Sequence, residues 1–281
     1  MRATDAAAGP QWVDRGPSPE GHNLTGHFNV LRDFRSLVLG NSRHVFVYLP
    51  PRYDFSPEHR YPVLYMQDGQ NLFDPALAFI HGQDWRLDET AQQLIETGAI
   101  EPLIIVGVDH AGIGRTGEFA PTVDLRYKEG GKADAYGAMV VTELKPWIDA
   151  HYRTRPDAAS TGLGGSSMGG LLSLFLALTR PDVFGRAAVM SPSLWWDRRH
   201  IIALARALER KPPVRLWLDC GSEEGYSTVH NVRILKNILI RCGWRMDADL
   251  SYREVEGGRH SEVDWGARAG EMLKFLFPAG S

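Results

Sequence analysis

Short apolar runs alternate with segments of helical periodicity along most of the chain. The continuous apolar runs at 62–66 and 103–108 are typical of strands buried on both faces of a parallel sheet. An alternating run at 43–49, which ends at two prolines, predicts an earlier strand. Further strands are expected at 159–163, 186–190, 214–219 and 250–255, and helices at 85–97, 133–151, 168–178, 201–208, 229–241 and 263–277.

This alternation predicts an α/β fold with a mostly parallel central sheet and helices on both of its faces. The chain of 281 residues contains no internal repeat, charge block or low-complexity tract. Residues 1–27 are polar and contain many glycines and prolines, so we expect a flexible N-terminal segment followed by a single domain at 28–281.

The composition excludes several classes of partner. The formal net charge of −3 favours neither a nucleic acid nor an anionic membrane surface. No apolar run approaches the roughly 20 residues of a membrane span, and the N-terminus lacks the apolar centre of a secretory signal. We therefore expect a cytoplasmic protein, and a secreted protein that has lost its signal is the alternative. The sequence gives no indication of the oligomeric state.

Two cysteines, Cys220 and Cys242, are too few for a disulfide framework, and both are expected to be buried or half-buried thiols. Neither belongs to a Cys-x-x-Cys pair or lies near a pair of histidines. The sequence therefore predicts no metal site, and it indicates no cofactor.

The most informative motif is Gly-x-Ser-x-Gly at 165–169, with Ser167 at its centre, between a predicted strand and a predicted helix. A serine on such a sharp turn has a strained backbone, and glycines on either side remove collisions with neighbouring chain. The start of the motif, at 162–165, also resembles a dinucleotide-binding fingerprint. That interpretation is disfavoured because Ser167 replaces the last glycine and because such fingerprints normally follow the first strand.

A serine nucleophile requires a histidine base, which in hydrolases of this architecture follows the serine and an acid in the chain. His200 and His230 lie at or near predicted helix starts, where solvated histidines are common. His260 lies in a glycine-containing loop between the last strand and the last helix, and is the predicted base.

The acid is expected in the loop at 220–225, after the preceding strand. Glu224 is favoured, with Glu223 as the alternative, because either carboxylate could reach an imidazole. Asp219 still belongs to the strand, and Asp197 follows an earlier strand. Both glutamates could equally be solvated loop residues.

Ester chemistry also requires N–H donors for the developing oxyanion. The predicted donors are the backbone N–H of Met168, directly after the serine, and the backbone N–H of Gln70, which follows a turn-forming glycine.

Trp195, Trp196 and Phe73 are candidates for an aromatic wall of the substrate pocket, although large aromatic residues are as often core residues. Arg115 either pairs with Glu118 at the rim of the site or contacts a polar substrate.

Several sequence blocks, in order, resemble the esterase D-like (putative-esterase) family of α/β-hydrolases, and the resemblance covers residues 35–277. The blocks are 43–50 (RHVFVYLP), 61–73 (YPVLYMQDGQNLF), 115–121 (RTGEFAP), 143–153 (ELKPWIDAHYR), 164–171 (GGSSMGGL), 191–197 (SPSLWWD) and 257–265 (GGRHSEVDW). Blocks 68–73 and 191–197 are most similar to the enterochelin-esterase-like and feruloyl-esterase-like branch.

The resemblance implies that Ser167 is the nucleophile, His260 the base, and that a carboxylate near Glu224 completes a triad; many members have aspartate there. It predicts a serine carboxylic-ester hydrolase that works through an acyl-enzyme on a small-molecule or oligomeric ester. The ester could be aromatic, a siderophore or a short-acyl compound. The alternatives are an acyltransferase, a thioesterase similar to S-formylglutathione hydrolase, and an inactive binding protein with a hydrolase fold.

Overall fold

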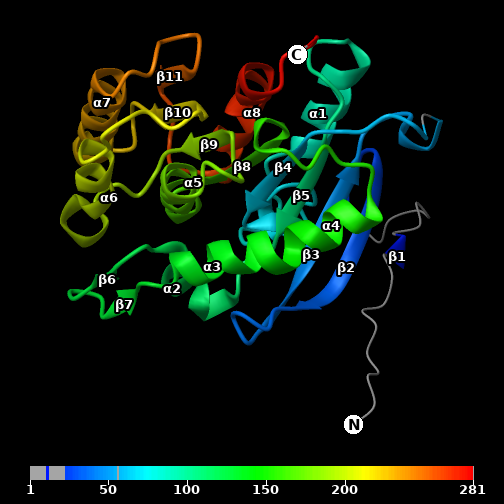
Figure 1. Ribbon diagram of the computed structural model, residues 1–281, viewed down its shortest axis with the longest axis horizontal. Helices are drawn as coiled ribbons and strands as arrows, with labels where there is room; N and C mark the ends of the chain where they lie inside the picture. The colour runs from blue at the N-terminus through cyan, green and yellow to red at the C-terminus, as the bar shows by residue number, and fades with distance from the viewer. Residues whose placement is uncertain (1–10, 13–22, 56, 281) are drawn as a thin grey trace.

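The computed structural model describes residues 11–12, 23–55 and 57–280, and its centre is a nine-stranded sheet in the order β1-β2-β3-β5-β4-β8-β9-β10-β11 (Figure 1). The first three pairings are antiparallel and the remaining five are parallel. The strands are β1 (Gln11–Trp12), β2 (His27–Arg35), β3 (Ser42–Leu49), β4 (Val63–Gln67), β5 (Ile104–Val108), β8 (Thr161–Ser166), β9 (Arg186–Met190), β10 (Arg215–Gly221) and β11 (Leu250–Val255).

Helices cover both faces of this sheet. One face packs against α1 (Leu87–Glu96) and α8 (Glu262–Leu276), which contact each other. The opposite face is covered by α3 (Ala133–Met139), α4 (Lys145–His151), α5 (Met168–Thr179), α6 (Trp196–Arg206) and α7 (Tyr226–Arg241) (Figure 1). The short helix α2 (Arg115–Phe119) and the hairpin of β6 (Val123–Asp124) and β7 (Glu129–Gly130) lie between β5 and α3 in the chain.

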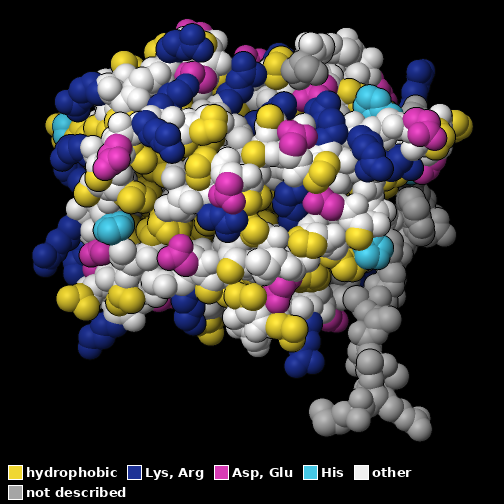
Figure 2. Space-filling view, viewed as in Figure 1, with side chains coloured by type: hydrophobic (Ala, Val, Ile, Leu, Met, Phe, Trp, Pro, Cys, Tyr) yellow, Lys and Arg dark blue, Asp and Glu magenta, His cyan; other side chains and the backbone are white. Residues whose placement is uncertain are grey.

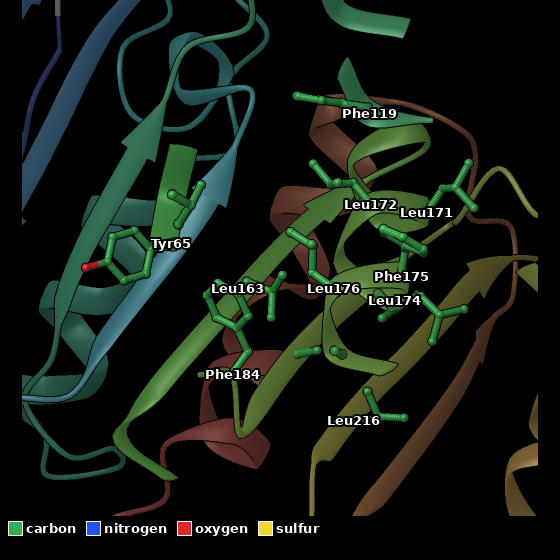
Figure 3. Close-up of a cluster of buried hydrophobic side chains, with 14 of the residues drawn as sticks. Tyr65, Phe119, Leu163, Leu171, Leu172, Leu174, Phe175, Leu176, Phe184 and Leu216 are labelled. Atoms are coloured by element: carbon green, nitrogen blue, oxygen red, sulfur yellow. The ribbon is translucent and has the colours of Figure 1, made fainter. Parts of the chain in front are cut away.

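Helix α5 is apolar on all sides because it is buried on all sides. Its residues from Met168 to Leu178 are all buried, because α5 lies over β8 and β9 with α3 and α6 beside it. Figure 3 shows side chains of α5 pointing toward Leu163 of β8, and Phe119 and Phe184 belong to the same buried cluster. A helix with no solvated face is held rigidly, and α5 begins directly after Ser167.

The predicted α/β class and the mostly parallel sheet are confirmed. The strand expected at 159–163 is instead β8, which begins at Thr161 and runs to Ser166. The helix expected at 133–151 consists of α3, a π-helical segment at Val140–Leu144, and α4. Pro146 lies just beyond this segment and has no N–H to donate to the preceding turn, which favours the wider winding.

Strand β2, helix α2 and the β6–β7 hairpin were not predicted. The flexible segment expected at 1–27 falls largely on residues 1–10 and 13–22, which lie outside the described residues. Within it, Gln11 and Trp12 pair with Val30 and Asn29 of β2, so this part of the segment extends the sheet.

Positive and negative side chains are interspersed over the face of the molecule shown in Figure 2, as the small net charge implies. Among the described residues, no helix combines the length and the apolar character that a bilayer crossing requires.

Two backbones meet closely beside the end of β4. A Cβ atom at Gly69 would lie 2.6 Å from the carbonyl carbon of Gly107 and 2.8 Å from the amide nitrogen of Val108. These are backbone atoms of β5 and cannot rotate away, so only glycine fits at residue 69 without displacing the strand.

We therefore expect Gly69→Ala to lower the free energy of unfolding by about 1–3 kcal/mol through overpacking. The matched control is Gly117→Ala in α2, where an added Cβ would meet nothing within 4 Å outside its own helix turn, and where we expect a change within about 0.5 kcal/mol. Urea unfolding of the two variants measures this difference, and equal stabilities would contradict the close approach of the two backbones.

Candidate active site

The predicted site residues gather where the parallel strands end. Ser167 directly follows β8, Glu224 follows β10, and His260 follows β11. Because these strands are parallel, their carboxyl ends lie at one edge of the sheet, the usual place for ligand sites in α/β proteins.

Ser167 has a strained backbone, with φ 57° and ψ −118°. Its N–H donates to the carbonyl oxygen of Met190 (3.0 Å), and its own carbonyl accepts the N–H of Ser193 (2.9 Å). These bonds tie both sides of the turn to the segment after β9. A non-glycine residue at positive φ persists only where its surroundings hold it, and here they do.

The flanking glycines are required by close contacts. A Cβ at Gly165 would lie 2.8 Å from Oε1 of Gln67 and 3.0 Å from the carbonyl carbon of Gly169. A Cβ at Gly169 would lie 3.3 Å from Cβ of Gln67. The crowding that the sequence motif implies is therefore present on both sides of Ser167.

Ser167, His260 and Glu224 form a continuous hydrogen-bonded chain. The Ser167 Oγ lies 3.0 Å from Nε2 of His260, and Nδ1 of His260 lies 2.9 Å from Oε2 of Glu224. With the proton on Nδ1, the imidazole donates to the carboxylate and leaves Nε2 free to accept from the serine hydroxyl. The His260 side chain is 43% exposed and that of Glu224 is 0% exposed, so the imidazole is open to a substrate while the carboxylate is sealed from water.

The other candidate acids have different partners. Glu223 forms an ion pair at the surface with Arg259 (2.9 Å). Asp219 is fully buried and accepts the indole N–H of Trp217 (2.7 Å). The backbone N–H of Asp197 donates to Asp124 of the hairpin (3.0 Å).

A buried polar network surrounds the carboxylate of Glu224. Its Oε1 accepts hydrogen bonds from the hydroxyl of Ser191 (2.5 Å) and from the N–H of Gly221 (2.7 Å). The Ser191 hydroxyl in turn accepts from Nε1 of Trp265 and from Nη2 of Arg268, each at 2.9 Å.

The guanidinium of Arg268 is the buried positive charge of this network, 3.7 Å from Glu224 and 3.5 Å from Asp219. Burial alone would raise the pKa of Glu224, but hydrogen bonds from His260, Ser191 and Gly221 hold it below its usual value. For Asp219, burial dominates and raises the pKa to about 6. Neighbouring carboxylates with pKa values moved in opposite directions are typical of active sites.

A cavity of about 780 Å³ opens over Ser167 and His260. Its lining residues are Asp68, Asn71, Phe79, Ile80, His110, Gly112, Ile113, Arg115, Thr116, Glu129, Ser166, Ser167, His260, Glu262 and Trp265. This volume is within the range of small-molecule sites.

Arg115 lines the cavity as predicted, but its partner is not Glu118. Its Nε and Nη2 donate to the two carboxylate oxygens of Asp68, at 2.6 and 2.7 Å. Glu118 instead pairs with the buried Arg43 (3.0 Å). Two separate ion pairs therefore replace the single pair that was expected.

The predicted aromatic wall is not part of this cavity. Phe73 is buried in the core against α1 and α8, with its ring edge to face with Phe28. Trp196 is buried under the hairpin, where its indole N–H donates to the carbonyl oxygen of Thr122 and its ring stacks on Tyr127. Trp195 contacts the same Tyr127 from outside. None of the three belongs to the lining. The two tryptophans pack against the 122–130 segment, and Phe73 packs against Gly107 of β5.

The predicted oxyanion donors lie on two different segments, the start of α5 and the turn after β4. Met168 is the first residue of α5, where amide groups have no partner within their own helix. Gln70 lies in the 3₁₀ turn Gly69–Asn71 after β4, and its side chain accepts the N–H of His110 (3.4 Å). Gln70 is not among the lining residues, and the roles of both amides stay predictions.

Sequence reasoning missed Ser191, Trp265 and Arg268. Trp265 and Arg268 are one helical turn apart on α8, a spacing that places both on one face. A buried arginine on an otherwise apolar helix face could have indicated a hidden carboxylate.

Across the described part of the chain, no cluster of His, Cys, Asp or Glu side chains could hold a metal ion.

The raised pKa of Asp219 predicts a pH-dependent stability. Between about pH 4 and pH 6 the native state binds more protons at Asp219 than the unfolded chain, whose aspartates have a pKa of about 3.9, so this residue contributes less stability as the pH rises. We expect wild type to lose stability relative to Asp219→Asn between pH 4.5 and pH 7.5. Urea unfolding at both values measures this change, and a difference independent of pH would contradict it.

Comparison with known proteins places the chain among esterases. The model of the family described as Putative esterase matches residues 36–276. An endo-1,4-beta-xylanase/feruloyl esterase of Xylanibacter ruminicola is 25% identical over 262 residues, which are 89% of this chain and 32% of the relative. The iron(III) salmochelin esterase of Escherichia coli is 27% identical over 268 residues, 90% of this chain and 59% of the relative. The chain thus spans less than two thirds of either relative.

A solved structure, the BES protein of Bacillus cereus, matches with a TM-score of 0.71 and 20% identity over 94% of this chain and 97% of that one. At this identity the match shows the fold alone. The match to the family model, in contrast, covers nearly the whole described domain, and Ser167, Glu224 and His260 lie within the matched range. The chain therefore belongs to the Putative esterase family and is a serine esterase, a carboxylic-ester hydrolase.

Proposed function

We propose that the protein hydrolyses a small-molecule ester through an acyl-enzyme, with Ser167 as nucleophile, His260 as general base and Glu224 as the acid that orients the imidazole. The observation that carries this proposal is the hydrogen-bonded chain from Ser167 through His260 to Glu224, with both distances at or below 3.0 Å. A serine hydroxyl becomes nucleophilic in this arrangement because the imidazole accepts its proton as the oxygen attacks.

In the first half of the reaction, the Ser167 Oγ bonds to the ester carbonyl carbon and its proton passes to Nε2 of His260. The carbonyl oxygen becomes an oxyanion, which the N–H groups of Met168 and Gln70 stabilise. His260 then gives the proton to the departing alcohol, and the acyl group stays on Ser167. A water molecule then attacks the acyl carbon while the same imidazole takes its proton. The bond between the acyl carbon and Ser167 Oγ breaks, the imidazolium returns the proton to Oγ, and the acid leaves.

Glu224 stabilises the imidazolium that exists during both halves. Its lowered pKa keeps the carboxylate ionised at neutral pH, and its bonds to Ser191 and Gly221 hold Oε1 so that Oε2 faces His260. An acid of fixed position also selects the tautomer in which Nε2 is the acceptor.

The substrate class is supported by the relatives and by the cavity. One relative is a feruloyl esterase and another a siderophore esterase, so an aromatic, siderophore or short-acyl ester is the proposed substrate. Arg115 lines the cavity and is the proposed contact for a polar part of the substrate. Transfer of the acyl group to another alcohol, or hydrolysis of a thioester, would use the same residues.

The first test removes the nucleophile. A fluorophosphonate probe should label the wild-type protein at Ser167, and Ser167→Ala should abolish both labelling and turnover of p-nitrophenyl acetate. Ser227→Ala, an exposed serine of α7, is the control and should keep both. Absence of a Ser167 adduct in the wild type would favour an inactive binding protein instead.

The second test separates two neighbouring glutamates. Glu224→Gln should lower kcat by on the order of a thousandfold or more, because the imidazolium loses its counter-charge and its fixed tautomer. Glu223→Gln, which removes only an exposed ion pair with Arg259, should stay within about twofold of wild type. If the two variants were equally impaired, the assignment of the acid to Glu224 would be refuted.

A further inference from the structure

The cavity over Ser167 has an apolar rim made by two separate loops. Phe79 and Ile80 lie on the loop between β4 and α1, and Ile113 lies on the 3₁₀ turn Gly112–Gly114 after β5. The exposed fractions are 78% for Phe79 and 99% for Ile113. Large apolar side chains that gather at the mouth of a cavity and face water typically mark a binding surface.

Hydrogen bonds hold both loops in place. The N–H of Phe79 donates to Oδ1 of Asn71 (2.9 Å), and the N–H of Gln83 donates to the carbonyl oxygen of Ile80 (2.9 Å). On the other loop, the N–H of Gly112 donates to Nδ1 of His110 (2.8 Å). The apolar rim is therefore a preformed surface, and binding a ligand there costs little ordering of the loops.

The charged groups of the cavity are mostly negative. Among the described residues that line it, the carboxylates are Asp68, Glu129 and Glu262, and the only guanidinium or ammonium group is that of Arg115. Asp68 accepts from two nitrogens of Arg115, so this pair is neutral as a unit. The carboxylates of Glu129 and Glu262 remain. Oε1 of Glu262 accepts the amide N–H of Asn71 (3.3 Å) and its charge also acts on Arg115, so one guanidinium faces three carboxylates in this cavity.

His110 does not change this balance. Desolvation by burial lowers the pKa of its imidazole, so the ring is neutral at pH 7. A negatively charged ligand entering the cavity would give up hydration and meet two carboxylates without gaining a free cation, which is unfavourable. An uncharged apolar group would meet the rim of Phe79, Ile80 and Ile113.

We propose that this cavity selects an uncharged ester whose apolar group lies against Phe79, Ile80 and Ile113, and that it disfavours esters with negative charges. Among the substrate classes proposed above, this favours an uncharged aromatic or short-acyl ester. The inference rests on the proposed function, because it concerns the substrate of the same serine.

The test uses a pair of chromogenic esters that share one acyl chain and differ in charge and by one methyl group. The mono-p-nitrophenyl ester of glutaric acid carries one carboxylate, and its methyl ester has the same acyl chain without the charge. We expect kcat/KM for the neutral compound to exceed that for the anion by about tenfold or more, the factor that about 1.4 kcal/mol of discrimination gives. Equal values, or a preference for the anion, would overturn the proposal.

Charge variants show whether the cavity causes the discrimination. Glu129→Gln combined with Glu262→Gln should raise the ratio of kcat/KM for the anionic ester to kcat/KM for the neutral ester severalfold. Glu58→Gln is the control, because this exposed glutamate precedes β4 at the opposite edge of the sheet, and it should change neither value. An unchanged ratio in the double variant would overturn the role of these two carboxylates.

The apolar rim is tested with Phe79→Ala combined with Ile113→Ala. This variant should lower kcat/KM for p-nitrophenyl hexanoate by at least about tenfold, since the loss of even one methylene contact in an apolar site already costs about that factor. Leu125→Ala, an equally exposed leucine of the hairpin turn, is the matched control and should have no effect. No loss in the rim variant would overturn the apolar contact.

The outcomes also separate this inference from the function on which it rests. Hydrolysis of p-nitrophenyl acetate without charge or chain-length discrimination would overturn the inference alone. Absence of any hydrolysis and of fluorophosphonate labelling in the wild type would overturn the proposed function, and the inference with it.

Discussion

The backbone of Ser167 is the constraint on which the rest of the site depends. A serine at positive φ is unfavourable by itself, and it is held here by hydrogen bonds to the chain after β9 and by a helix that is buried on every side. Because α5 cannot shift without disturbing the core, the strain stays at the turn. The hydroxyl is thereby placed at a fixed point relative to the ends of the neighbouring strands, where His260 and Glu224 can reach it.

The second constraint is the negative charge buried behind His260. A carboxylate sealed from water is stable only if hydrogen bonds and a positive charge replace its hydration. Ser191 and Gly221 supply the bonds, and Arg268 supplies the charge from α8. The last helix is therefore part of the site, although its residues come after every predicted catalytic position in the chain.

The sequence predicted the α/β class, the buried central strands and the three residues that the structure brings together, because apolar runs and glycine spacing are local patterns. It did not predict β2 or the β6–β7 hairpin, since apolar and polar residues do not alternate regularly along β2 and each hairpin strand has only two residues. It placed Phe73, Trp195 and Trp196 at the cavity because aromatic character alone does not tell a core residue from a lining residue. The partner of Arg115 and the network of Arg268 depend on tertiary contacts that no local pattern contains.

The close approach of Gly221 to Gly258 constrains the acid. An added Cβ at Gly221 would lie 2.1 Å from the carbonyl oxygen of Gly258, so the acid loop and the histidine loop are in direct backbone contact. This contact sets the gap that the acid must bridge, and the glutamate at position 224 has the length for it. An aspartate at this position would be one carbon shorter, so the same hydrogen bond to His260 would require a different path of the acid loop or of the histidine loop.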